Sequence, residues 1–305
     1  MARILRLTRV LFMASVVMGL VAGCAGAPPA PTAPTAGAAA GGANVTATSA
    51  GAAAAPAIGG TGATTEVGTP RSQTLIVQTF DGKTDNPSNM NPLLASYSIW
   101  RGFRELGWGY LWEMDTATGQ SYPELAADLP KVLDDKHTQF QVALKKGVYW
   151  SDGVEFTADD VIYTLDTYFA GKGKLTYFGV PVITGYVKSY KKLDDYTLEI
   201  DTTHPAYDFV TTLGVYTWGS AFNIVPKHIF EKETDLAAFK NTNPVTLGAY
   251  TIKSFDPNGQ WHLWQRRDDW QRSSTGSLGQ PAAMYVFYKN FGDEQTRTLA
   301  FIKNE

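Results

Sequence analysis

The sequence predicts a mixed α/β fold for residues 70–305, because segments with strand and helix patterns alternate along this part of the chain. Short runs rich in β-branched residues indicate strands, and a capped segment with one apolar face indicates a helix. With about 235 residues, this part is close to the size at which a single hydrophobic core stops growing and separate lobes form.

Strand patterns occur in several places. Thr74–Thr79 is a short apolar run rich in β-branched side chains, and Gln139–Leu144 alternates with period two, like a half-buried strand. Two further pairs of segments flank residues suited to tight turns, so each pair predicts a hairpin. The hairpins are expected at 187–200, around Leu193-Asp194-Asp195, and at 249–266, around Asp256-Pro257-Asn258-Gly259.

One helix has clear start and stop signals. Thr157-Ala158-Asp159-Asp160 has the spacing of a capping box, and Gly171 and Gly173 follow the apolar residues. Pro226 can start a second helix and Asp293 can cap a third. The apolar residues expected on these helices are Val161, Ile162, Leu165 and Phe169 on the first, and Leu299, Ala300 and Ile302 on the third.

Composition excludes several classes of function. A formal net charge of -3 and no visible basic patch argue against a nucleic-acid partner. The single cysteine, Cys24, cannot form an internal disulfide, and no Cys/His cluster provides a metal site. We expect no cofactor. The four histidines are widely separated and fit surface or capping roles better than metal ligation: His137, His204, His228 and His262.

The chain lacks the sequence signatures of common hydrolases and nucleotide-binding enzymes. No G-x-S-x-G, H-E-x-x-H, G-x-x-x-x-G-K-[ST] or G-x-G-x-x-G pattern occurs. Adjacent carboxylates at Asp159-Asp160, Asp194-Asp195 and Asp268-Asp269 fit turns and helix starts better than a facing catalytic pair. We therefore predict no catalytic residues and no enzymatic activity.

The first residues predict an export signal. Arg3, Arg6 and Arg9 precede an apolar run over 10–22, which is shorter than the ~20 residues that span a bilayer. The run ends at Val21-Ala22-Gly23-Cys24, which resembles the lipobox of bacterial lipoproteins. The resemblance implies a signal peptide over 1–23 and lipid attachment at Cys24. The alternative is a buried cysteine in an uncleaved helix, which the prolines at 28, 29, 31 and 34 oppose.

Residues 24–69 predict a disordered tether. They are almost wholly Ala, Gly, Pro, Thr and Ser, with Glu66 the single charge, so they contain too little apolar surface for a core. As a flexible coil, the segment would reach roughly 35 to 40 Å, enough to hold a folded domain clear of lipid headgroups.

Several ordered motifs resemble one known family. Asn91-Pro92-Leu93-Leu94 and Pro123-Glu124-Leu125-Ala126 come first, and Gly147–Gly153 follows with the sequence G-V-Y-W-S-D-G. This chain is similar to the bacterial extracellular solute-binding proteins of family 5, the peptide, oligopeptide and nickel receptors of ABC importers. The resemblance continues through Thr157–Val161, Asp195–Thr197, Val225–His228, Asn243–Val245 and Gly248–Tyr250.

The resemblance implies a periplasmic-binding-protein-like type II lobe, about 70–100 and 205–305, with an inserted subdomain at about 101–204. It further implies a monomeric receptor that captures peptides outside the cytoplasmic membrane, in the periplasmic space, and delivers them to an ABC permease and its ATPase. Family members are considerably longer than this chain. We therefore expect a fragment from which the second lobe is missing.

The ligand class stays open between two alternatives, with a secreted lipoprotein hydrolase less favoured. Peptides are the first expectation. The segment Trp261–Ser273 resembles members associated with oligosaccharides, whose rings can stack on aromatic faces, although Trp261, Trp264 and Trp270 can equally pack a core. Candidate ligand contacts are Ser96 and Tyr97, on the loop after the first Asn-Pro, and Trp218, in a Gly-flanked loop.

Overall fold

The computed structural model describes residues 64–79, 82–95, 99–214 and 221–303. Contacts divide the chain into two units, Met1–Ala54 and Ala55–Glu305, and every described residue belongs to the second. The predicted signal peptide, Cys24 and most of the predicted tether therefore lie outside the described residues. The ligand-contact candidates Ser96, Tyr97 and Trp218 lie outside them as well.

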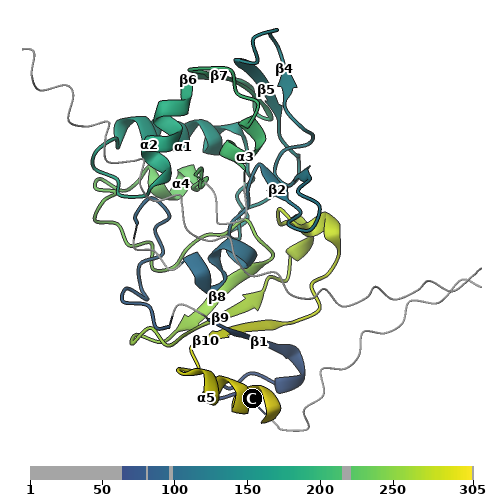
Figure 1. Ribbon diagram of the computed structural model, residues 1–305, viewed down its shortest axis with the longest axis vertical. Coiled ribbons are helices and arrows are strands. Elements are labelled where there is room, and N and C mark those ends of the chain that lie inside the picture. Colours follow the sequence, from purple (N-terminus) through teal and green to yellow (C-terminus); the bar gives the residue numbers. More distant parts are fainter. Residues whose placement is uncertain (1–63, 80–81, 96–98, 215–220, 304–305) are drawn as a thin grey trace, which may run out of the picture. The chain divides into compact units, whose positions relative to one another are not determined.

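The first sheet joins strands from the two ends of the described chain (Figure 1). Its order is β1 (Thr74–Gln78), β10 (Tyr285–Lys289), β9 (Trp261–Arg266) and β8 (Tyr250–Phe255). β1 runs parallel to β10, and the other neighbours are antiparallel. The strand expected at Thr74–Thr79 is confirmed. The sequence analysis does not predict β10.

The hairpin expected at 249–266 is formed by β8 and β9. Its turn closes when the amide of Gly259 donates to the carbonyl of Asp256 at 2.9 Å, while the Asp256 carboxylate accepts from the amide of Gln260 at 3.0 Å. Gly259 has φ 78°, a conformation that glycine adopts without strain. The turn residues identified in the sequence thus fix this register.

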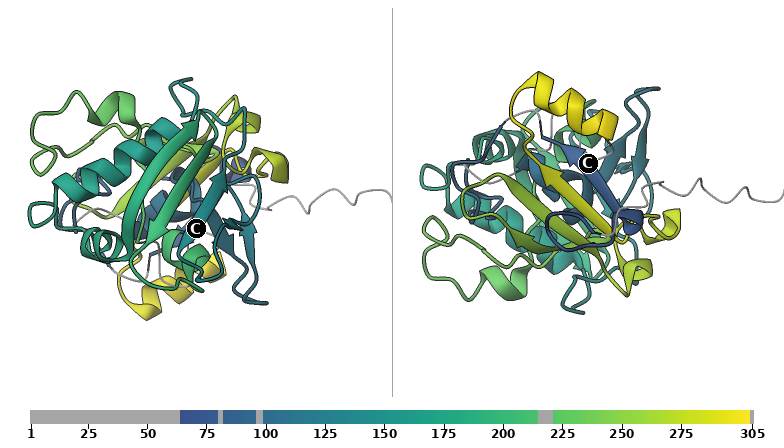
Figure 2. Two further views of the ribbon diagram at one scale, coloured as in Figure 1. Left: turned by 90° about the horizontal axis from the view of Figure 1, so that it is seen from above. Right: turned by 90° about the horizontal axis from the view of Figure 1, so that it is seen from below.

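A second sheet has the order β4 (Lys131–Val132), β5 (Gln139–Ala143), β7 (Thr197–Thr202) and β6 (Val187–Asp194), all antiparallel. It confirms the strand expected at Gln139–Leu144 and the hairpin at 187–200. Helices α1 (Ala158–Ala170) and α2 (Gly179–Tyr186) pack on β6, as the view from above shows (Figure 2).

Helix α1 starts at the predicted capping box. The Thr157 side chain accepts from the amide of Asp159, and Asp160 accepts from the amide of Thr157 at 3.1 Å. The helix ends before Gly171, as expected. Its buried face differs from the expected one, because Phe169 is exposed and Tyr168 is buried in its place. Four residues span slightly more than one turn of an α-helix. The buried face therefore continues from Leu165 to Tyr168, three residues later, and not to Phe169.

Short elements connect the two sheets. A π-helical segment, Ile99–Gly107, has a kink at Arg101 and Gly102. The hairpin β2 (Trp112–Met114) and β3 (Ser121–Pro123) follows it. The remaining elements are α3 (Phe209–Leu213), α4 (Lys227–Phe230), α5 (Glu294–Lys303) and the 3₁₀ turns Arg71–Gln73, Trp270–Arg272 and Gly276–Leu278.

The helices expected near Pro226 and Asp293 are both present. Helix α4 is one turn long, and Asp293 accepts from the amide of Thr296 at 2.8 Å to cap α5. Ala300 of α5 is buried, but Leu299 and Ile302 are exposed. Among the described residues, no helix has the length and apolar character needed to cross a membrane.

The core is rich in aromatic side chains. Trp112, Trp150 and Trp264 are fully buried, whereas Trp261 and Trp270 are half-buried. Trp264 therefore packs in the core, which is one of the two roles that the sequence left open for it, the other being to stack on a sugar ring. His262 of β9 is also fully buried, between the rings of Phe103 and Phe255, so the surface or capping role expected for it is wrong. Its position on the inward face of β9 places it in the core.

Candidate functional site

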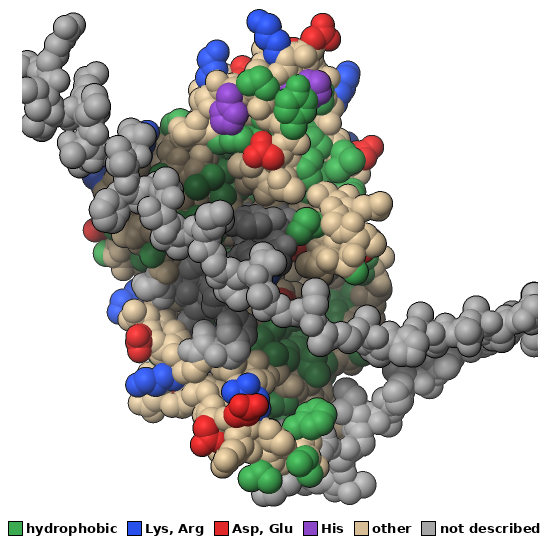
Figure 3. Space-filling view, in the orientation of Figure 1, with side chains coloured by type: hydrophobic (Ala, Val, Ile, Leu, Met, Phe, Trp, Pro, Cys, Tyr) green, Lys and Arg blue, Asp and Glu red, His purple; other side chains and the backbone are tan. Residues whose placement is uncertain are grey.

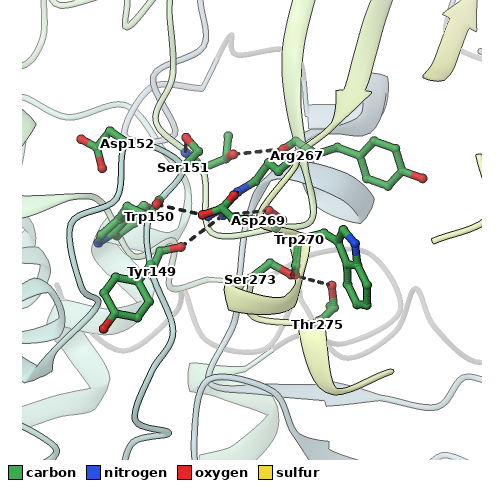
Figure 4. A network of polar contacts seen from close by, with 12 residues as sticks. Tyr149, Trp150, Ser151, Asp152, Arg267, Asp269, Trp270, Ser273 and Thr275 are labelled. Atoms are coloured by element: carbon green, nitrogen blue, oxygen red, sulfur yellow. Dashed lines mark hydrogen bonds and ion pairs between the residues drawn. The ribbon is translucent and has the colours of Figure 1, made fainter. Parts of the chain in front are cut away.

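Several motif segments that are far apart in the sequence meet around Arg267, just after β9. The buried guanidinium donates from Nη1 to the carbonyl of Tyr149 at 3.1 Å and from Nη2 to that of Trp150 at 3.3 Å (Figure 4). Nη1 also donates to the carbonyl of Gly248 at 3.3 Å. The Asp269 carboxylate accepts from Nε and Nη2, both at 2.9 Å. This pair therefore joins the G-V-Y-W-S-D-G segment to the first sheet.

Asp160 forms a second connection between motifs. Besides capping α1, it accepts from the amide of Lys227 at 2.9 Å, which fixes the first turn of α4. Burial raises the pKa of Asp160, and its two backbone donors oppose that rise. One carboxylate thus serves the starts of two helices, and the two residues that it joins, Asp160 and Lys227, are 67 positions apart in the sequence.

We call Arg267, Asp269 and the carbonyl groups that the guanidinium binds the Arg267 joint. Ser151 and Asp152 extend this joint. The amide of Ser151 donates to the carbonyl of Thr246 at 2.8 Å, and the Ser151 hydroxyl accepts from the amide of Thr246 at 3.0 Å. Asp152 pairs with Nε2 of His228 at 2.7 Å. Trp150 packs edge-on against Phe156. These contacts give the motif residues a structural role.

A cavity of about 620 Å³ lies beside this joint. Its walls come from five places: the end of the π-helical segment, the β2–β3 hairpin with Glu124, Lys145, residues 248–250 and the loop 274–281. Pro123 and Glu124 of one motif and Gly248, Ala249 and Tyr250 of another contribute to it. Motifs that the sequence identifies only by resemblance therefore meet at one hollow.

The Arg267 joint also positions the loop 274–281. The Arg272 guanidinium lies 3.4 Å from the centre of the Tyr149 ring, and the Ser273 hydroxyl donates to the carbonyl of Trp270 at 2.7 Å. The amide of Ser274 then donates to the carbonyl of Leu247 at 2.9 Å. Figure 4 shows Ser273 and Thr275 side by side at this corner. Thr275 is one of the residues that line the cavity.

Gly248 is required where the first sheet meets the π-helical segment. The amides of Leu247 and Gly248 both donate to the carbonyl of Gly107, at 3.0 and 2.9 Å. A Cβ atom at position 248 would clash with the carbonyl oxygen of Leu106. This close backbone approach explains the glycine of the G-A-Y motif.

Glu124 is the most perturbed acid at the cavity. It is 5% exposed, and its carboxyl group accepts from the amide of Tyr110 at 3.1 Å. Burial raises its pKa to about 8, and the nearby charge of Glu113 contributes to the rise. At neutral pH the folded chain therefore holds this carboxyl group mainly in its protonated form.

The cavity also contains basic groups. Lys145 is half-buried and donates from Nζ to the carbonyl of Pro123 at 3.3 Å, while burial lowers its pKa. Burial raises the pKa of Glu113, and the charge of Arg104 opposes this. The cavity thus combines acids, bases and the aromatic residues Trp108, Tyr122 and Tyr250 in one hollow.

The described residues beside the candidates Ser96, Tyr97 and Trp218 are held by a common segment. The amide of Ala95 donates to the hydroxyl of Thr176 at 3.0 Å, and the amide of Tyr177 donates to the carbonyl of Leu93 at 3.2 Å. On the other side, Asn223 donates from Nδ2 to the carbonyl of Pro92 at 3.4 Å. Residues 92–95, which precede Ser96, thus contact both the segment 176–177 and Asn223, a described residue that follows Trp218 in the sequence.

Asn91 fixes the loop that leads to the first two candidates. This buried side chain donates from Nδ2 to the carbonyls of Leu236 and Phe239, at 2.9 and 2.7 Å. Its Oδ1 accepts from the amide of Leu93 at 3.0 Å. The Asn-Pro motif therefore anchors the segment that precedes Ser96.

The sequence predicts none of the cavity's charged residues as site residues. Glu124 belongs to a quoted motif, whereas Glu113 lies within β2 and Lys145 follows β5, and neither has a local pattern that marks a site. No group of three or more His, Cys, Asp or Glu side chains suited to a metal ion occurs in the part of the chain that the structure describes.

The chain has the fold of part of the periplasmic binding proteins. It superposes on a periplasmic oligopeptide-binding protein of an ABC transporter from Thermotoga maritima with a TM-score of 0.64 and 24% identity, over 76% of this chain and 40% of that one. It is also similar to the oligopeptide-binding protein AppA from Bacillus subtilis in complex with a nonapeptide, with a TM-score of 0.60 and 23% identity, over 75% and 42% of the two chains. These likenesses confirm the predicted fold class.

Residues 120–305 match the family model for the bacterial extracellular solute-binding proteins, family 5 Middle. The chain therefore belongs to this family, as its motifs indicated. It is 27% identical to the probable ABC transporter periplasmic-binding protein SapA of Escherichia coli K12 over 175 residues, which are 53% of this chain and 31% of SapA. It therefore spans about a third of that relative's length.

Proposed function

We propose that this chain is the substrate-binding lipoprotein of an ABC importer, which captures peptides outside the cytoplasmic membrane and delivers them to a permease. The membership of a solute-binding family carries this proposal. The likeness to AppA in complex with a nonapeptide favours a peptide ligand. Lipid attachment at Cys24 would keep the receptor at the outer face of the membrane, where it would act as a monomer.

We place ligand contacts at Ser96, Tyr97 and Trp218. Described residues beside the two segments contact each other, since Asn223 donates to the carbonyl of Pro92, and this supports a common site. In this proposal the loops contact the ligand from one side, and their anchors at Asn91 and Asn223 limit the entropy lost on binding.

Thermal unfolding with a peptide library tests the ligand. A peptide present at 100 times its Kd should stabilise the chain by about 2.7 kcal/mol. Tyr97→Ala and Trp218→Ala should reduce that stabilisation, whereas Tyr207→Ala, at a side chain that is 81% exposed, should not. Absence of stabilisation by any peptide would contradict a peptide receptor.

Metabolic labelling tests the anchor. Radiolabelled palmitate should enter the chain in a bacterial host, and Cys24→Ala should abolish the labelling. Incorporation that persists in the Cys24→Ala variant would contradict attachment at this residue.

An oligosaccharide is the second candidate ligand. The Thermotoga maritima oligopeptide-binding protein has also been solved with mannohexaose bound, and that structure matches this chain with a TM-score of 0.62. Manno-, cello- and xylo-oligosaccharides therefore belong in the same thermal screen. Stabilisation by these sugars and by no peptide would replace the first candidate with the second.

A further inference from the structure

The last turns of helix α5 expose a cluster of large apolar side chains. Phe301 is 86% exposed, Ile302 72% and Leu299 56%, and Leu75 of strand β1 is 46% exposed. β1 and α5 line a common hollow of about 550 Å³, to which Leu75 and Phe301 both contribute. We call these four side chains the α5 patch. Contiguous exposed apolar side chains mark a contact with a protein or a membrane.

The segment that leads into the described part of the chain is fixed beside this patch. Oε2 of Glu66 pairs with Nζ of Lys289, at the end of β10, at 2.6 Å. The hydroxyl of Thr74, the first residue of β1, donates to that of Thr69 at 2.8 Å. Nζ of Lys289 also lies 4.7 Å from the centre of the Phe291 ring, which lines the hollow together with α5. The last residues of the predicted tether therefore bind the first sheet next to α5.

The proposed lipid anchor is connected to the domain through this segment. Residues 1–63 precede the described part, and Cys24 is one of them. An anchor at Cys24 would thus confine the domain to the membrane through a chain that ends beside the α5 patch. Such confinement raises the effective concentration of the patch at the bilayer, so that a weak contact is enough to hold it there.

The side chains of α5 fit a lipid interface. Apolar side chains can be buried at the boundary between headgroups and acyl chains, and Arg297, exposed on the same helix, can bind headgroup phosphates. The acidic residue Glu294 lies in the first turn, at the opposite end of the helix from Ile302. A fluid bilayer adapts to side chains as exposed as Phe301, whereas a protein partner must match their shape.

We propose that the α5 patch contacts the lipid bilayer and forms a second membrane attachment besides the lipid anchor. This inference rests on the proposed function, because Cys24 supplies the first attachment. The end of α5 and the neighbouring edge of the first sheet, at β1, then face the membrane (Figure 1).

A nitroxide label on the patch tests this contact by electron paramagnetic resonance. Cys24 is the single cysteine and would be blocked by lipid, so an introduced cysteine is the only free thiol. In the mature lipidated chain on vesicles of phosphatidylethanolamine and phosphatidylglycerol, a nitroxide at Ile302→Cys should collide several-fold more often with membrane-soluble oxygen than with a water-soluble nickel chelate. The same label at Tyr207→Cys, an 81% exposed position outside the patch, should remain accessible to nickel.

Two variants assign the effect to the patch. Phe301→Asp and Leu299→Asp, each combined with Ile302→Cys, should restore access of nickel to the nitroxide, because a charged side chain disfavours burial among lipids. Both side chains are exposed, so neither substitution removes a core contact. Glu294→Gln, in the first turn of the same helix, should leave the collision ratio unchanged.

The outcomes separate this inference from the proposed function. A water-exposed nitroxide at position 302 in an anchored chain overturns the inference and leaves the lipid anchor supported. Shielding from both reagents before vesicles are added would show that a protein, such as a second copy of this chain, covers the patch, and this also overturns it. Absence of lipid at Cys24 contradicts the anchor. The Cys24→Ala chain with excess vesicles then tests the patch alone, where burial of the nitroxide supports the inference and exposure overturns it.

Discussion

Asp269 binds the Arg267 guanidinium through both of its carboxylate oxygens, each at 2.9 Å, while the same guanidinium donates to two consecutive carbonyls of the G-V-Y-W-S-D-G segment. The Arg267 side chain is 3% exposed and that of Asp269 is 39% exposed. Because the cation is buried, its partner carboxylate compensates a charge that water does not reach.

Loss of the Asp269 charge should destabilise the chain. Asp269→Asn leaves a buried guanidinium uncompensated, so we expect a loss of about 3 kcal/mol, or a fall in Tm of roughly 6 to 12 °C. Asp268→Asn removes a charge from the exposed neighbouring side chain and should shift Tm by less than about 2 °C. Equal shifts in the two variants, measured by calorimetry, would contradict the role of the ion pair.

Asp160 should be more important than its neighbour Asp159. Asp160→Ala removes the acceptor for the amides of Thr157 and Lys227, so a loss of about 2 to 4 kcal/mol is expected. Asp159→Ala removes the same charge from the same helical turn and breaks a part-exposed ion pair with Lys192, at a cost of about 1 kcal/mol or less. Urea denaturation of both variants measures the difference, and a larger loss for Asp159→Ala would refute it.

His262 should make the fold sensitive to acid. Burial lowers its pKa from 6.5 to about 4, with a smaller contribution from the charge of Arg101. The unfolded chain thus binds the proton more tightly, so the stabilisation is complete above pH 6.5 and is lost as pH falls through about 4. The free energy of unfolding, measured by urea denaturation, should fall by up to about 1.4 kcal/mol per pH unit in this range.

His262→Phe is the matched variant for this prediction, because its ring can pack against Phe103 and Phe255. It should be less dependent on pH between 6.5 and 4 than the parent chain. An identical slope in both proteins would show that His262 does not cause the acid sensitivity.

Glu124 should have the opposite effect at alkaline pH. Burial raises its pKa from 4.5 to about 8, so its contribution to stability is complete below pH 4.5 and is lost as pH rises through about 8. Relative to the parent chain, Glu124→Gln should therefore gain stability as pH increases from 5 to 9. Denaturation at both pH values checks this, and a constant difference would contradict the assignment.

Local signals account for the elements that the sequence predicted. The turn Asp256–Gly259 and the cap at Thr157 act through neighbouring backbone groups, so both are visible in a short segment. The resemblance to family 5 allowed the fold class to be predicted as well, because the family's motifs contain the residues that hold distant segments together.

Elements that depend on distant partners were not predicted. Helix α2 contains Gly179 and Gly185, which disfavour a helix locally, yet Val180 and Ile183 pack into the core. The cavity has the same character, since five segments separated in the sequence form its walls. No short window around Glu124 or Lys145 contains the information that they line one hollow.

The parallel pairing of β1 with β10 has a consequence for biogenesis. Thr74 pairs with Tyr285, so a ribosome must synthesise more than two hundred residues, roughly ten to forty seconds of translation, before that sheet can form. The second sheet uses only residues 131–202 and can assemble earlier on the nascent chain. Until β10 emerges, the β1 edge is a site at which chaperones can protect the polypeptide from aggregation.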